Sequence, residues 1–402
     1  MRMQLSISRI ACVVGCLIAQ SLASPGLMAA LDRNQKPVMP TVRDDSPAAN
    51  WDLWQAYKRG FLDESGRVVD HDDGARTTSE AQAYGLFFAL VANDRPAFDR
   101  ILQWTQTNLA AGDLTANLPA WLWGCSADGK WQVLDKNPAS DADLWMAYTL
   151  IQAARLWQEP GFVKLGDAIA ANIAGQSVTK MPGAGTVLLP APLGFSAKDH
   201  VELNPSYLPV QVLYGLAAAL PEGPWAQIAD NTPLVIKRAS PHGFALDWVM
   251  FSTDKGWQPG RGPADEPRSS FDAIRVYLWA GMTDPQTRGR KELLAALQGM
   301  RSYMKDNFYP PMIVSAEGKV IAERGGVGYS AALLPFLKAV GDQRALTLQL
   351  SRLEIARQSS SALYGDPPRY YDQNLALFGT GWVDNLFRFT SGGALEVRWS
   401  SK

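Results

Sequence analysis

Residues 139–151, with the sequence ASDADLWMAYTLI, decide how this chain folds. Apolar residues in this stretch recur at the spacing i, i+3, i+4, i+7, which places them on one face of a helix. They are Leu144, Ala147, Tyr148 and Ile151. Two acids, Asp141 and Asp143, stand at the start of the same segment. The stretch therefore predicts a helix with an apolar face and an acidic first turn.

The same helical spacing dominates the rest of the chain. Further helices are expected at roughly 51–62, 80–92, 98–109, 161–175, 207–220, 224–238, 271–281, 286–306, 329–340, 343–357 and 372–379. Short strands are expected only at 187–189, 245–251 and 387–399. About twelve helices without a detectable sequence repeat favour an all-α domain of paired antiparallel helices that close into a ring, rather than a solenoid.

Residues 1–30 are typical of a secretory signal peptide, because a positively charged start precedes a short apolar run. That run, residues 10–19, is too short to span a bilayer, which takes ~20 residues. An uncleaved membrane anchor is the alternative. Residues 31–50 are polar and contain prolines, which indicates a flexible lead-in. No linker or charge block follows, so residues 51–402 are predicted to form a single domain.

The composition excludes several classes of function. With 38 basic and 39 acidic residues, the chain has no basic excess for binding nucleic-acid phosphates. Only three histidines are present, and zinc-protease, P-loop, dinucleotide-binding and G-x-S-x-G motifs are missing. Asp70, Asp72 and Gly74 form only an incomplete calcium-loop pattern, with Ala81 where a bidentate Glu belongs. We therefore expect no metal or organic cofactor, which leaves carboxylates and aromatic rings as the groups for chemistry.

Three segments place an acid at the start of an expected helix. They are Thr77-Thr78-Ser79-Glu80, Ser140-Asp141-Ala142-Asp143 and Ser269-Ser270-Phe271-Asp272. Each loosely follows the capping-box pattern, so one interpretation is that the acids only cap their helices. However, residues two apart on a helix point about 200° apart, so Asp143 can serve the cap while Asp141 faces elsewhere. In addition, Arg275 shares a helix face with Asp272 and can hold it ionised.

A protonated carboxyl group and an ionised one on opposite sides of a sugar are suited to cleaving a glycosidic bond. Glu80 can act as the acid if apolar burial or a nearby carboxylate such as Asp141 keeps it protonated. Trp121 and Trp123 lie in an expected loop between Pro119 and Gly124. We expect one of these two rings to be exposed as a platform for a sugar, although both could instead belong to the core.

Seven ordered motifs resemble glycoside hydrolase family 8. They are TTSEAQAYG (77–85), LPAWLWG (118–124), ASDADLWMA (139–147), NPSY (204–207), SFDAIRVY (270–277), GYSAA (328–332) and LFGTGW (377–382). The resemblance runs from about Trp51 to Phe389 and is strongest to the periplasmic endoglucanases encoded with bacterial cellulose synthase. It implies an (α/α)6 barrel, an inverting mechanism and β-1,4-glucan as the substrate.

The resemblance also implies roles for individual residues. Glu80 falls at the proton donor and Asp272 at the general base, which implies a separation of about 6.5–9.5 Å between their carboxyl groups. Asp141 falls at the aspartate of the family signature, for which we expect sugar binding and distortion in the central subsite. Tyr207 and Arg275 fall at positions that help to hold the attacking water and the base.

Further contacts to the substrate are expected from Trp121, Trp123, Tyr84 and Tyr277, which lie within the matching motifs. One departure from the family pattern lies directly beside the base. Phe271 stands where a tyrosine often precedes the base, which removes a hydroxyl group from this position.

The sequence thus predicts an exported, periplasmic or secreted endo-β-1,4-glucanase that acts on cellulose chains and is linked to cellulose biosynthesis. The cellulose synthase complex is a candidate partner. One alternative is a non-catalytic glucan-binding or scaffold protein of the cellulose export machinery. Another is the same fold acting on xylan, chitosan or mixed-linkage glucan, although a cationic polymer such as chitosan would prefer a more acidic cleft.

Overall fold

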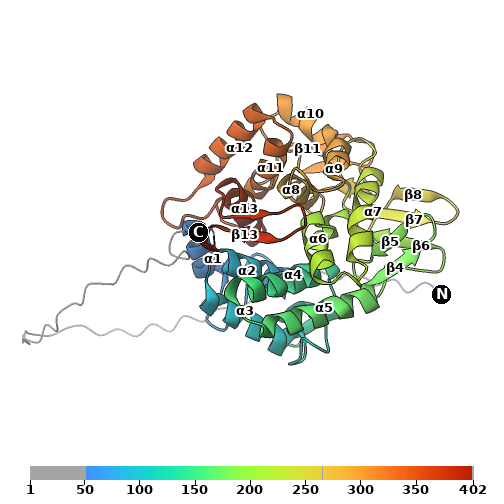
Figure 1. The fold of residues 1–402 in the computed structure, drawn as a ribbon. Coiled ribbons are helices and arrows are strands. Elements are labelled where there is room, and N and C mark those ends of the chain that lie inside the picture. Colours follow the sequence, from blue (N-terminus) through green and yellow to red (C-terminus); the bar gives the residue numbers. More distant parts are fainter. Residues whose placement is uncertain (1–50, 265, 401–402) are drawn as a thin grey trace, which may run out of the picture. The chain divides into compact units, whose positions relative to one another are not determined.

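The computed structural model describes residues 51–264 and 266–400. The predicted signal peptide (1–30) and lead-in (31–50) therefore lie outside the described residues. The described part contains thirteen α-helices, which alternate along the chain between an outer and an inner ring (Figure 1). None of these helices is long and apolar enough to cross a membrane.

Six helices form the inner ring: α2 (Ser79–Val91), α4 (Ser140–Trp157), α6 (Val210–Ala219), α8 (Ile274–Met282), α11 (Val327–Ala339) and α13 (Tyr370–Val383). The outer ring consists of α1 (Asp52–Phe61), α3 (Arg95–Leu109), α5 (Gly161–Ser177), α7 (Trp225–Arg238), α9 (Arg290–Ala296), α10 (Gln298–Asp306) and α12 (Gln343–Ala356). Five of the six inner helices pack against an outer helix next to them in the chain, α13 packs against α1, and all six contact other inner helices. This arrangement confirms the predicted (α/α)6 barrel.

The two rings differ in how their helices are buried. All nine residues of α8 are buried, and so is α11 from Val327 to Leu337. In α3, by contrast, one face is buried by residues spaced three or four apart and the opposite face is exposed. A helix that is apolar all round belongs inside, whereas an apolar stripe suits a helix at the surface. The sequences of the helices therefore sort them into their rings.

Aromatic rings from four inner helices fill the centre of the barrel. The ring of Trp145 on α4 lies 5.1 Å from that of Trp279 on α8 and 5.2 Å from that of Phe378 on α13. Phe378 also meets Tyr84 of α2 edge to face at 5.0 Å. These contacts join α13 to α2 and so close the ring of inner helices.

Short antiparallel strands gather where the inner helices begin. They form the three-stranded sheets β1 (Thr77–Thr78), β2 (Ala120–Cys125), β3 (Trp131–Pro138); β6 (His200–Leu203), β7 (Val249–Ser252), β8 (Gly256–Pro259); and β9 (Arg268–Ser269), β10 (Ile313–Ser315), β11 (Val320–Ala322). Strand β1 leads into α2, β3 into α4 and β9 into the turn before α8. A fourth pair, β4 (Val178–Met181) and β5 (Gly185–Leu188), follows α5.

A hairpin of β12 (Phe387–Phe389) and β13 (Leu395–Val397) covers the opposite end of the inner ring. The backbone N–H of Leu395 donates to the side chain of Gln152 near the end of α4, and the Tyr148 hydroxyl donates to the carbonyl of Gly393. Figure 1 shows β13 lying across the middle of the ring. The barrel is therefore filled at its centre and covered at the end where its inner helices finish.

Three sequence predictions are wrong in detail. Nine of the described strands, β1–β4, β6 and β8–β11, lie outside the three stretches in which strands were expected. The single helix expected at 286–306 is two helices, α9 and α10, which meet at Leu297. The backbone of His242 packs so closely on Gly299 that a Cβ there would lie 2.5 Å from the His242 carbonyl oxygen. This close packing coincides with the break.

The stretch containing Trp121 and Trp123 is strand β2 of a hairpin, not a loop. Its partner β3 follows a turn at Gly129, whose φ of +80° suits glycine. The proline and glycine flanking the two tryptophans mark the limits of an extended segment rather than an irregular one.

Candidate active site

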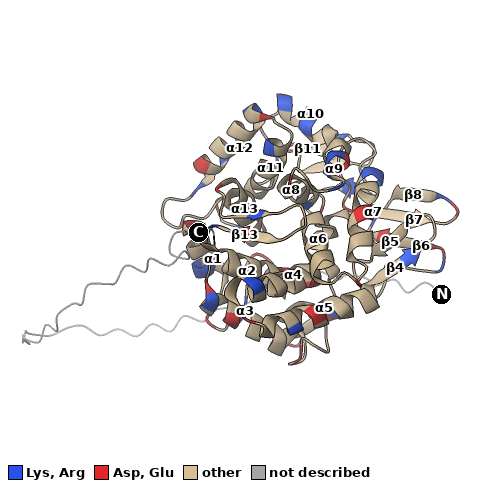
Figure 2. Cartoon of the chain, in the orientation of Figure 1, with Lys and Arg blue, Asp and Glu red and all other residues tan. Residues whose placement is uncertain are grey.

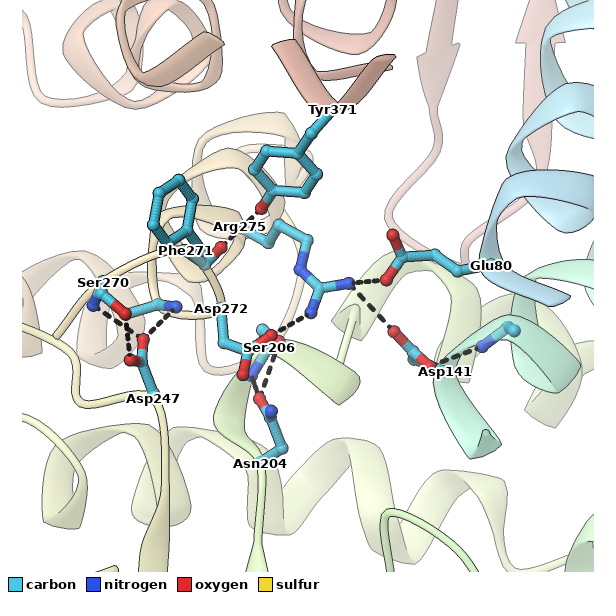
Figure 3. Close-up of polar contacts among 12 residues, drawn as sticks. Glu80, Asp141, Asn204, Ser206, Asp247, Ser270, Phe271, Asp272, Arg275 and Tyr371 are labelled. Atoms are coloured by element: carbon cyan, nitrogen blue, oxygen red, sulfur yellow. Dashed lines mark hydrogen bonds and ion pairs between the residues drawn. The ribbon is translucent and has the colours of Figure 1, made fainter. Parts of the chain in front are cut away.

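A single buried arginine binds all three predicted catalytic acids (Figure 3). Arg275 lies in the first turn of α8 and its side chain is only 3% exposed. Its Nη1 donates to Oε2 of Glu80 and, at 3.0 Å, to Oδ2 of Asp141. Its Nη2 donates to Oδ1 of Asp272 at 2.7 Å. The structure therefore brings together acids that are up to 192 positions apart in the sequence.

Glu80 is available for this cluster because another residue caps its helix. The Thr78 hydroxyl accepts the backbone N–H of Ala81 at 3.1 Å, which is an ordinary N-cap bond. The Glu80 carboxylate instead reaches Arg275, and its side chain keeps 18% of its surface exposed. A proton donor needs this combination of a fixed position and access to the substrate.

Of the two acids of α4, Asp143 differs from the sequence prediction. Asp141 gives Oδ1 to the N–H of Ala142 at 2.8 Å and Oδ2 to Arg275. Asp143 does not cap the helix, because both its oxygens are buried without a hydrogen-bond partner in the described residues. The Asp143 side chain is fully buried. Asp141 does face elsewhere, as expected, but Asp143 does not serve the cap.

Burial controls the electrostatics of α4. It is the main reason why the pKa of Asp141 rises from the ordinary 3.8 to about 7, with Glu80 and Asp272 adding to the rise and Arg275 opposing it. Burial, and then the charge of Asp141, raise the pKa of Asp143 well above its usual value. Burial would lower the pKa of Arg275, but Glu80 and the other negative groups raise it well above the ordinary value. Arg275, which stays positively charged, thus faces several carboxyl groups. Of these, Asp141 can stay protonated near neutral pH.

Tyrosines surround the arginine. The Tyr84 hydroxyl accepts from Nη1 of Arg275 at 3.3 Å, and the guanidinium lies 5.7 Å from the ring centre of Tyr207. Both residues were predicted at the site. Tyr371, at the start of α13, was not predicted, and its hydroxyl donates to the carbonyl of Phe271 at 2.5 Å. Burial is the main reason why the pKa of Tyr371 lies well above its ordinary value, with Arg275 opposing the rise and Glu80 and Asp272 adding to it.

The remaining predicted aromatic residues lie outside this cluster. Tyr277 is fully buried, and its hydroxyl accepts the backbone N–H of Ala245. Trp121 is half-buried and packs against the core, and Trp123 is also half-buried. The exposed ring on this hairpin is Trp131, which is 49% exposed and stacks on Trp123 at 5.1 Å. Sequence reasoning missed Trp131 because it lies beyond the turn.

Phe271 itself is prominent at the site. Its side chain is 54% exposed, directly before Asp272, and it meets the rings of Tyr329 and Tyr371 edge to face. Tyr329 begins its inner helix near the same point. Together with Tyr207, these contacts show that the starts of all six inner helices converge on the acids.

Comparisons with known proteins agree with this geometry. Residues 35–385 match the family model described as glycosyl hydrolases family 8. An endoglucanase of Xanthomonas axonopodis pv. citri is 44% identical over 88% of this chain and 91% of the relative. An endoglucanase of Escherichia coli K12 is 40% identical over 88% of this chain and 93% of the relative. The solved structure of an endo-1,4-D-glucanase from Vibrio fischeri ES114 is 37% identical, with a TM-score of 0.77 over 87% of this chain and 99% of that one.

Proposed function

The chain belongs to family 8 of the glycosyl hydrolases, and we propose that it is an endo-1,4-β-glucanase that cleaves internal bonds of cellulose with inversion. The observation that carries this proposal is the binding of Glu80, Asp141 and Asp272 to one guanidinium. Helix caps need no common partner. Carboxyl groups that must act together on one sugar ring do need a fixed mutual position.

The proposed reaction takes place in one step. Glu80 donates its proton to the glycosidic oxygen, so the bond from that oxygen to the anomeric carbon breaks and a free hydroxyl leaves. Asp272 takes a proton from a water molecule on the opposite face, and the water oxygen bonds to the anomeric carbon. The two acids bind different nitrogens of Arg275, Nη1 and Nη2. Inversion requires about 6.5–9.5 Å between their carboxyl groups, which leaves room for the water molecule.

Asp141 is the third part of the proposed site. It is buried and binds the same nitrogen of Arg275 as Glu80. We assign it to binding and distorting the sugar in the central subsite, since its high pKa makes it able to donate as well as accept a hydrogen bond near pH 7. It forms no covalent bond to the sugar, because inversion has no covalent intermediate.

The segment that leads to the base also lines a cavity. A cavity of about 930 Å³ lies between the sheet of β6–β8 and the sheet of β9–β11. Its lining includes Arg268, four residues before Asp272, together with Glu202 and Ile321. Polar and apolar side chains both line this cavity, which suits the edges and faces of a glucan chain.

Substitution of the proton donor tests the activity. Glu80→Gln should lower the release of reducing ends from carboxymethylcellulose by about 10²–10⁴-fold, the usual contribution of general acid catalysis. Glu222→Gln, at an exposed loop position, is the matched control and should act as the wild type does. Equal background release from the wild type and Glu80→Gln would instead indicate a non-catalytic glucan-binding or scaffold protein.

Two further measurements define the reaction. Proton NMR of fresh products should show the α-anomer first, and a β-anomer would contradict inversion. Chain-length products from cellulose, xylan, chitosan and mixed-linkage glucan should be dominated by β-1,4-glucan cleavage.

We also propose export to the periplasm or the medium and a link to cellulose biosynthesis, on the strength of the N-terminal segment and the family resemblance. Sequencing of the mature N-terminus tests export. Co-purification with the cellulose synthase complex tests the partnership.

A further inference from the structure

The helix that carries the proposed base has no cap of its own. The residue before α8, Ala273, makes no capping bond through its side chain. The sequence pattern Ser269-Ser270-Phe271-Asp272 suggested a local cap, but Asp272 turns to Arg275 instead. The first amides of α8 must therefore find an acceptor elsewhere, because a helix start leaves its N–H groups unpaired.

Asp247 supplies that acceptor from a loop between α7 and β7. Its Oδ1 accepts the backbone N–H of Ser270 at 2.7 Å and that of Ala273 at 2.8 Å, and its Oδ2 accepts the Ser270 hydroxyl at 2.5 Å. Figure 3 shows these three bonds converging on one carboxylate. The two amides stand on either side of Phe271 and Asp272, so Asp247 fixes both ends of the turn that presents the base.

The loop that carries Asp247 is itself held on two sides. The backbone N–H of Asp247 donates to the carbonyl of Arg268 at 2.8 Å, just before the turn. Two residues earlier, the N–H of Ala245 donates to the Tyr277 hydroxyl at 2.9 Å, one turn into α8. Asp247 is 6% exposed, and both of its carboxylate oxygens are taken up by bonds to the turn. These bonds leave it little freedom to move relative to α8.

We propose that Asp247 is a positioning residue for the reaction, a distant cap that holds Asp272 in place to receive the proton from water. This inference rests on the proposed function, in which Asp272 is the base. The amide bonds are charge-assisted, so they are among the stronger hydrogen bonds a protein can use for this purpose.

Loss of the charge on Asp247 should leave its three bonds to the turn in place. Titratable groups around it are Asp272, Tyr277 and Tyr329. Burial first, and then Asp272, raise the pKa of Asp247 to about 6. A protonated Asp247 keeps its geometry, because Oδ1 still accepts both amides while the new O–H on Oδ2 donates to the Ser270 hydroxyl. An asparagine can make the same three bonds without the charge.

Two substitutions therefore separate geometry from charge. Asp247→Ala should lower kcat on carboxymethylcellulose by about 10²-fold, the effect of a misplacement of about 1 Å, with KM changed less than threefold. Asp247→Asn should recover most of that kcat.

Asp94→Ala is the matched control. Asp94 is also a buried cap, on the outer helix α3, where its Oδ1 accepts the N–H of Ala97. This variant should lose thermal stability but keep the kcat and pH profile of the wild type. A kcat for Asp247→Ala within threefold of the wild type, or an Asp247→Asn variant as impaired as Asp247→Ala, would overturn the proposal.

Hydrogen exchange tests the cap independently of activity. In Asp247→Ala, the amides of Ser270 and Ala273 should exchange at least tenfold faster than in the wild type, and in Asp247→Asn they should not. Unchanged exchange in Asp247→Ala overturns the inference. A wild type that cleaves none of the polymers but shows the expected exchange pattern instead refutes the proposed function alone.

Discussion

Acids at the starts of the outer helices and acids at the starts of the inner helices do different work. On the outside, Asp94 and Asp342 each give a carboxylate oxygen to the backbone of their own helix, at 3.2 and 3.0 Å. On the inside, Glu80 and Asp272 give theirs to Arg275, and capping falls to Thr78 and Asp247. Acidic residues near helix starts thus stabilise one ring and form the proposed site in the other. What differs is whether another residue has taken over the cap.

Removal of Arg275, the cation that the three acids share, should have the largest effect on the inner ring. Arg275→Met leaves three carboxylates without their common partner, and loss of one member of a buried ion pair typically costs about 3–5 kcal/mol. We expect the largest loss of unfolding free energy at pH 7 and a smaller loss at pH 4, where carboxyl groups are protonated and repel less. Urea unfolding at both pH values measures this, and an equal loss at both would show that Arg275 serves packing alone.

The buried Asp141 should make the stability of the inner ring depend on pH. Its pKa is about 7 in the folded protein against an ordinary 3.8, so between these values the folded state binds more protons than the unfolded state. Its contribution to stability is therefore lost as pH rises from about 4 to 7.

Asp141→Asn cannot ionise and should escape that loss. The unfolding free energy of the variant relative to the wild type should rise between pH 4 and 7. Thermal unfolding of both proteins across this range is the measurement, and a constant difference would mean that Asp141 keeps an ordinary pKa.

The smallest effect is expected in the outer ring. Asp342→Ala removes the cap of α12, which should cost about 1 kcal/mol of unfolding free energy, as such caps usually do. The kcat should not change, because α12 contributes no residue to the proposed site. A clear fall in kcat would contradict the claim that acids at the starts of the outer helices serve stability alone.

The sequence predicts the helices well because each ring has its own apolar pattern. Periodicity locates the outer helix α3 through one buried face, and continuous apolar stretches locate inner helices such as α11. It also finds the pair Asp272 and Arg275, since residues three apart on a helix share a face. The meeting of Glu80, Asp141 and Asp272 could not come from spacing, and it was expected only through the family resemblance.

Two residues near the site escaped sequence reasoning for different reasons. Asp247 caps a helix from 23 positions before Ser270, within a stretch interpreted as a strand, so no local pattern marks it. Tyr371 could have been found, because it opens the last inner helix just as Glu80 and Asp141 open theirs. The expected helix of 372–379 began two residues too late to include it.

The aromatic plug formed by Trp145, Trp279 and Phe378, backed by the β12–β13 hairpin, has a consequence for the polymer. A glucan chain cannot pass through the middle of the barrel, because aromatic side chains fill it and the hairpin covers one end. The chain has to bind across the end of the barrel where the acids converge, and both product chains must leave from that same end. Such an enzyme needs neither terminus of its substrate, so it can sever a strand that is still anchored at both ends.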